Sequence, residues 1–143
     1  IVKAAGFTDP RTVNHRRLGI IDPVLKDKLG PIRFASVTAR LIKLEGLDTA
    51  CEDYGQAVIY KGGIPGMEQV FVLDAEHSIE AGRVFPVCGN TLAMLMDTRF
   101  APWFDVIGDG AAHYGLFPGC AAPDVFAATT ADEASASPGG CCG

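Results

Sequence analysis

The sequence predicts the end of an α/β sheet, followed by a small α+β domain and a flexible tail. Strand-like alternation and one capped helix fill residues 1–44, which are too few elements for a domain of their own. Short apolar strands and a second capped helix follow over residues 54–120. Residues 121–143 are rich in Ala, Ser, Thr, Gly and Pro, lack Lys and Arg, and are therefore predicted to be a flexible tail.

The first segment has the pattern of the last part of an α/β sheet. We expect it to comprise, in order, the last turns of a helix at Ile1–Phe7 that Gly6 ends, a strand at Arg11–Leu18, a short helix capped by Asp22 with Pro23 at its first position and Gly30 at its end, and a strand at Phe34–Leu44. Because the chain opens inside a helical pattern and not at a Met, we expect residues upstream of Ile1 in the complete protein.

The second segment begins after a polar stretch, residues 45–53, that we expect to be a linker. The predicted elements of the small α+β domain are strands at Gly55–Lys61, Val70–Leu73 and Arg83–Val87, a turn at Lys61–Gly66, and a helix capped by Asn90 with Leu92, Leu95 and Met96 on its apolar face. Trp103, Phe104 and Val106 are expected in the core.

Composition excludes several classes of function. Lys and Arg number 12 and Asp and Glu 17, so the formal net charge is −5, which disfavours nucleic-acid binding. No apolar run approaches the roughly 20 residues that span a bilayer. The five cysteines are odd in number, two of them are adjacent, and no secretion signal is present. These features predict a reducing, cytoplasmic location and no membrane partner.

The adjacent pair Cys141 and Cys142 is the sharpest chemical feature. Two thiolates on one glycine-flanked segment can close on a single soft ion, and As(III), which takes three sulfurs, suits them. Cys120 is the candidate third thiol. Zinc fits less well, because it prefers four ligands and no CxxC or His-x-His spacing occurs. The alternative is a flexible tail whose thiols have no function.

The other candidate residues are less specific. Cys88, between a predicted strand and a helix cap, is either a reactive thiol near a helix N-terminus or a buried small hydrophobe. Cys51 is expected to be exposed in the linker. His15, His77 and His113 lie far apart without ligand spacing, so surface or hydrogen-bonded core roles are expected for them. Composition and spacing alone show no complete active site.

A set of short motifs in a fixed order resembles the C-terminal part of arsenite S-adenosylmethionine methyltransferases. The motifs are Glu52–Gln56, Tyr60–Gly66, Pro86–Thr91, Thr98–Ala101, His113–Phe117 and the closing Gly-Gly-Cys-Cys-Gly. The opening, from Ala5–Phe7 through Arg33–Leu41, looks like the last helix and last two strands of that family's Rossmann-like class I methyltransferase sheet. The resemblance covers about residues 1–120 and the last few residues.

The resemblance implies that the intact enzyme methylates arsenite stepwise, with S-adenosylmethionine as methyl donor and a thiol reductant, in arsenic detoxification. Thiolates would hold As(III) while its lone pair attacks the sulfonium methyl group. The partners implied are arsenite or methylated arsenicals and the upstream catalytic domain. In the family, the glycine-rich cofactor loop and the arsenic-binding cysteines lie before Ile1, so no catalytic or cofactor-binding residue is assigned here. Cys141 and Cys142 match the family's tail pair.

The domain organisation that follows is the end of the methyltransferase domain at 1–44, a linker at 45–53, a small α+β domain at 54–120 and a Cys-tipped tail at 121–143. The segment alone is expected to be inactive. Two alternatives remain: a stand-alone thiol-based metalloid-binding module, and a structural module that docks on the catalytic domain.

Overall fold

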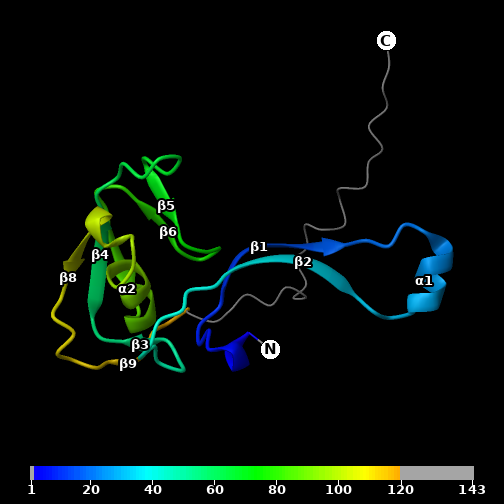
Figure 1. Cartoon of the computed structure of the whole chain (residues 1–143), viewed down its shortest axis with the longest axis horizontal. Helices are drawn as coiled ribbons and strands as arrows, with labels where there is room; N and C mark the ends of the chain where they lie inside the picture. The colour runs from blue at the N-terminus through cyan, green and yellow to red at the C-terminus, as the bar shows by residue number, and fades with distance from the viewer. Residues whose placement is uncertain (1, 120–143) are drawn as a thin grey trace, which may run out of the picture. The chain divides into compact units, whose positions relative to one another are not determined.

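The computed structural model describes residues 2–119. These residues fall into two compact units, one formed by residues 2–14 with 38–119 and the other by residues 15–37. Figure 1 shows their elements in chain order. Within residues 2–119, no helix has both the length and the apolar character needed to cross a bilayer.

A three-stranded antiparallel sheet forms the centre of the larger unit (Figure 1). Its middle strand is β4 (Gln56–Tyr60), flanked by β7 (Val84–Val87) and β8 (Phe104–Ile107). Helix α2 (Gly89–Met96) follows β7 directly and packs on β4 and β7. The order of strands in the sheet therefore joins segments that lie almost fifty residues apart in the sequence.

The core lies between this sheet, α2 and a β-hairpin formed by residues 70–80. Its fully or almost fully buried members are Val58, Tyr60, Phe71, Leu73, Ile79, Val87, Met94, Leu95 and Phe104. Val58 and Tyr60 share one face of β4, and both side chains are fully buried. The prediction that Val106 is in the core is wrong, because β8 is an edge strand and the Val106 side chain stays 40% exposed.

The β-hairpin of residues 70–80 joins β5 (Val70–Val72) to β6 (Ser78–Glu80), with Phe71 opposite Ile79 and both side chains buried. Strand β6 was not predicted, since Ser78–Glu80 contains one apolar residue and gives no alternation to recognise.

The Tyr60 hydroxyl fixes the turn that follows β4. It donates a hydrogen bond to the Met67 carbonyl at 2.8 Å and accepts one from the Ile64 amide at 3.0 Å. Two backbone groups of a glycine-rich segment are therefore satisfied by one buried phenol.

The expected linker and the expected helix cap both differ in detail from the structure. Glu52–Asp53 forms strand β3, which pairs with β9 (Gly115–Leu116), and Leu47 packs against the core. Cys88, not Asn90, caps α2: its backbone is extended and its Sγ accepts the Thr91 amide hydrogen at 3.4 Å. Asn90 lies inside the first turn, where its amide contacts other segments.

The elements before residue 41 largely match expectation. Strands β1 (Arg11–Leu18) and β2 (Phe34–Arg40) form a two-stranded sheet, and β2 ends four residues before the predicted end at Leu44. Asp22 caps helix α1 (Pro23–Leu29), and its Oδ1 accepts hydrogen bonds from the Val24 and Leu25 amides at 2.8 and 3.0 Å. The expected helix end is a single 3₁₀ turn, η1 (Lys3–Ala5), closed by Gly6 at φ 88°.

Candidate functional site

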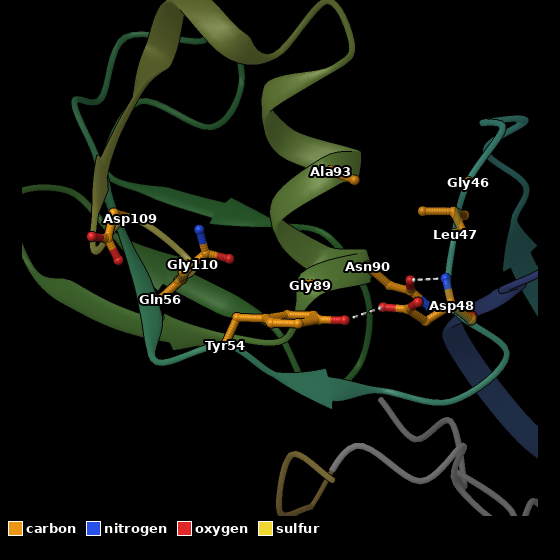
Figure 2. Close-up of a pocket in the computed structure, with 10 residues that line it drawn as sticks. All are labelled: Gly46, Leu47, Asp48, Tyr54, Gln56, Gly89, Asn90, Ala93, Asp109 and Gly110. Carbon is orange, nitrogen blue, oxygen red and sulfur yellow. Dashed lines mark hydrogen bonds between the residues drawn. The ribbon is translucent and has the colours of Figure 1, made fainter. Parts of the chain in front are cut away.

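A polar pocket of about 350 Å³ lies beside the first turns of α2 (Figure 2). Its lining comes from the segment before β3, from the link between β3 and β4, from β4, from α2 and from the loop after β8. The lining residues are Gly46, Leu47, Asp48, Tyr54, Gln56, Gly89, Asn90, Ala93, Asp109 and Gly110.

Asp48 and Asn90 join one wall of this pocket to the helix. The Asp48 amide donates to Asn90 Oδ1 at 2.8 Å, and Asn90 Nδ2 donates to the Asp48 carbonyl at 2.9 Å. The Tyr54 hydroxyl points toward the Asp48 carboxylate at 3.4 Å (Figure 2). Burial, the Asp48 charge and this hydrogen bond raise the pKa of Tyr54, so the phenol stays protonated at neutral pH.

Two glycines line the pocket at positions where a side chain would collide with a neighbouring residue. A Cβ atom on Gly89 would lie 2.9 Å from the Tyr54 ring, and one on Gly110 would lie 2.9 Å from the Gln56 amide nitrogen. The lining contains two carboxylates and no Cys, His, Lys or Arg. The pocket can therefore accept hydrogen bonds from a polar ligand, but its lining holds no thiol for a soft ion.

A second site is a buried polar network at the N-terminus of α2. Arg11, only 7% exposed, is its centre. Its guanidinium donates to Asp9 at 2.8 Å, to Thr91 Oγ1 at 3.0 Å and to Asp74 at 3.3 Å, and lies 3.9 Å from Cys88 Sγ. Burial alone lowers the pKa of Arg11, but Asp9, Cys88 and Asp74 outweigh it and raise the pKa overall, so the group is a permanent cation.

Asp74 connects Arg11 to His77. Asp74 Oδ1 accepts the backbone amides of Glu76 and His77, both at 2.9 Å, and lies 2.7 Å from His77 Nδ1. The opposite ring nitrogen of His77 lies 3.4 Å from Thr91 Oγ1. Burial favours the protonated acid, but the His77 hydrogen bond and charge, the Glu76 amide and Arg11 lower the pKa of Asp74.

Replacing Asp74 with asparagine is expected to remove part of the acid sensitivity of this unit. A carboxyl whose folded pKa lies below its unfolded value stabilises the fold above about pH 4, and that stabilisation is lost as the pH falls further. The difference in unfolding free energy between the wild-type chain and Asp74→Asn should therefore shrink between about pH 6 and about pH 3. Urea unfolding followed by Trp103 fluorescence measures this difference.

Asp105→Asn is the matched control for that experiment. The Asp105 carboxylate is 63% exposed and pairs with Lys61 at 3.2 Å on the surface, where ion pairs contribute little. A difference for Asp74→Asn that stays constant across the same pH range would contradict the expectation.

The structure places only some of the residues singled out from the sequence. Cys88 is fully buried, as expected for a small hydrophobe. It also lies at a helix N-terminus, the position expected for the alternative of a reactive thiol. Cys51 is half-buried and not fully exposed. Among residues 2–119, no group of three or more His, Cys, Asp or Glu side chains is placed to hold a metal ion. Cys120, Cys141 and Cys142 lie outside the described residues.

The three histidines occupy the surface and hydrogen-bonded interior positions expected for them. His15 is exposed on β1, and exposed His113 pairs with Glu52 at 2.9 Å. His77 is a hydrogen-bonded interior residue.

Sequence reasoning missed the Arg11 network as a whole. The local part of the network could have been predicted from the sequence. Asp74, followed by His77 three residues later, fits a turn in which the aspartate side chain accepts hydrogen bonds from nearby backbone amides. Its long-range part carries none, since Arg11 is 63 residues from Asp74 and 80 from Thr91.

The comparison with known proteins gives a consistent result. Residues 54–143 match the family model described as the arsenite methyltransferase C-terminal domain. The chain is 61% identical, over 84% of its length, to an arsenite methyltransferase from Aquipseudomonas alcaligenes, of which it covers 35%. It is 31% identical over its whole length to the human arsenite methyltransferase, of which it covers 40%.

A solved structure agrees with these sequence relatives. It is an arsenic(III) S-adenosylmethionine methyltransferase from Chlamydomonas reinhardtii, with a TM-score of 0.75 and 42% identity. The likeness covers 80% of this chain and 38% of that one, so the chain spans well under half the length of its relatives.

Proposed function

We propose a function from one premise: the chain belongs to the arsenite methyltransferase family. It acts as the C-terminal part of an enzyme that moves a methyl group from S-adenosylmethionine to trivalent arsenic, and it is inactive by itself. The observation that carries this proposal is the family-model match over residues 54–143. No catalytic or S-adenosylmethionine-binding residue is assigned to the chain.

Methyl transfer by the purified 143-residue chain tests this proposal directly. With arsenite, S-adenosylmethionine and a thiol reductant, we expect no methylated arsenic by mass spectrometry of the products. The intact relative from Aquipseudomonas alcaligenes is the control for the assay conditions. Methylated arsenic formed by this chain at a rate comparable with the control would overturn the proposed inactivity.

The tail thiols are proposed to capture As(III). Cys141 and Cys142 form the pair, with Cys120 as the third sulfur, because soft thiolates favour this ion. We expect titration with arsenite to show one bound As(III) per chain in the wild type, and none after Cys141→Ser with Cys142→Ser. Cys51→Ser is the matched control, since it removes one thiol and leaves the tail pair intact. An unchanged stoichiometry after the double substitution would exclude the tail pair.

Docking on an upstream domain is the second proposed role, and residues 15–37 support it. Apolar side chains there are largely exposed, with Ile21 at 97%, Val24 at 60% and Ile32 at 57%. Ile21 lines an apolar hollow of about 440 Å³ together with Leu18, Leu25 and other residues. Exposed apolar surface of this kind marks an interaction site. This proposal includes the assignment of residues 1–44 to the end of a Rossmann-like sheet. It also includes the domain boundaries at residues 44, 54 and 120.

A further inference from the structure

Polar side-chain contacts join the segment Asp9–Arg11 to the rest of the larger unit. Arg11 donates to Asp9, Asp74 and Thr91, and Asn90 Nδ2 donates to Asp9 Oδ2 at 3.1 Å. The backbone adds a bond from the Ala75 amide to the Thr12 carbonyl at 2.9 Å, and Arg11 is also the first residue of β1, which pairs with β2. Apart from this strand pairing, hydrogen bonds and ion pairs hold the segment in place.

None of residues 2–8, which precede this segment, is fully buried, although Phe7 is half-buried. Turn η1 has no buried residue, and Val2 is 36% exposed. Regions with few buried apolar contacts open locally at a lower free energy than the whole fold. Releasing Asp9–Arg11 would leave the apolar core, from Val58 to Phe104, in place.

The closed state also contains an unsatisfied group. Arg11 Nε is buried and, among the described residues, has no hydrogen-bond partner. A buried donor without a partner costs free energy that exposure to water would recover. This cost favours the opening of the Arg11 side chain over the opening of a fully satisfied segment.

Cys88 lies against this segment, because its sulfur is in contact with the Arg11 guanidinium. Its side chain is fully buried at the N-terminus of α2. Its sulfur lies 3.4 Å from the Thr91 amide, 3.2 Å from Thr91 Oγ1 and 3.9 Å from Arg11. Donors of this kind at a helix N-terminus stabilise negative charge on sulfur, and the thiolate is the nucleophilic form of cysteine.

We propose that Asp9–Arg11 is a latch over Cys88, which opens without unfolding the core and exposes a thiol to soft, thiophilic electrophiles. The latch makes Cys88 a gated modification site, distinct from the tail thiols and independent of whether they bind arsenic.

The test labels Cys88 with an aromatic disulfide reagent, 5,5′-dithiobis(2-nitrobenzoate), in the 143-residue chain. The other four cysteines are changed to serine in every variant, so that only Cys88 reacts. The thiolate attacks the reagent's disulfide, a mixed disulfide forms and one thionitrobenzoate leaves, which absorbance records. Trp103 fluorescence follows global unfolding in the same urea series.

If Cys88 is labelled through local opening, its labelling rate should change little at low urea. The equilibrium constant for global unfolding, in contrast, rises steeply with urea. Arg11→Met should raise that rate by about tenfold or more, because a charged group's hydrogen bonds hold the latch closed. Arg16→Met, which removes an exposed arginine from the same strand, should leave it unchanged.

Phe71→Leu separates a latch from whole-domain unfolding. It lowers the stability of the core but breaks no latch contact, so labelling at low urea should stay at the wild-type rate. The proposal fails if Cys88 is labelled only as fast as global unfolding allows, or if Phe71→Leu accelerates labelling in proportion to its loss of stability. Both outcomes can be read even if Arg11→Met does not fold.

Discussion

Replacing Phe71 with alanine is expected to lower the unfolding free energy by about 3–5 kcal/mol. The Phe71 side chain is 1% exposed and its ring packs edge-on against Phe100 and Phe104, at centroid distances of 5.0 and 5.2 Å. Truncation removes the buried ring and leaves a cavity between the β5–β6 hairpin and the central sheet. Urea unfolding followed by the fluorescence of Trp103, the one tryptophan, measures the loss.

Val72→Ala is the matched control for this prediction. Val72 is the next residue on β5, points to the opposite face and is 37% exposed, so its truncation should cost less than about 1 kcal/mol. Similar losses for Phe71→Ala and Val72→Ala would contradict the placement of the core on the Phe71 face.

Gly108→Ala is expected to be strongly destabilising. Gly108 has φ 90°, and a Cβ atom there would lie 2.9 Å from the carbonyl oxygen of Gly55, which is backbone and cannot rotate away. The backbone conformation alone costs about 1–2 kcal/mol for an L residue. Separating β8 from the start of β4 to relieve the clash adds about 1–3 kcal/mol.

Gly63→Ala isolates these two contributions. Gly63 has a nearly identical φ of 89°, but a Cβ atom there meets nothing within 4 Å. Its substitution should therefore show the cost of the backbone conformation without the clash. Equal changes in the urea midpoint for Gly63→Ala and Gly108→Ala would show that the close approach to Gly55 carries no energy.

Local signals predicted the elements that local interactions determine. Asp22, Pro23 and Gly30 predicted α1 within its observed bounds, because a cap, a fixed φ and a glycine with positive φ act within a few residues. The same reasoning failed at α2. Asn90 is a better N-cap by type than Cys88, but its amide is used by Asp9 and Asp48, which the sequence alone does not bring near.

Long-range pairing explains what sequence reasoning missed at the site. Arg11 appears in the sequence as an ordinary strand residue, and nothing near it indicates that its guanidinium is buried against Asp74 and Thr91. The pocket beside α2 likewise combines Asp48, Tyr54 and Asp109, which come from three separate segments. Such groups are recognisable only after the strand order β7-β4-β8 is known.

The phenol of Tyr60 has a consequence for protein engineering. The glycine-rich stretch at 61–67 resembles the kind of exposed loop into which an affinity tag or fluorescent reporter is commonly spliced. Here the Ile64 amide and the Met67 carbonyl must both reach one buried oxygen. An insertion between Ile64 and Met67 would separate these two groups and leave the phenol without its partners, so a splice site is better sought elsewhere in the chain.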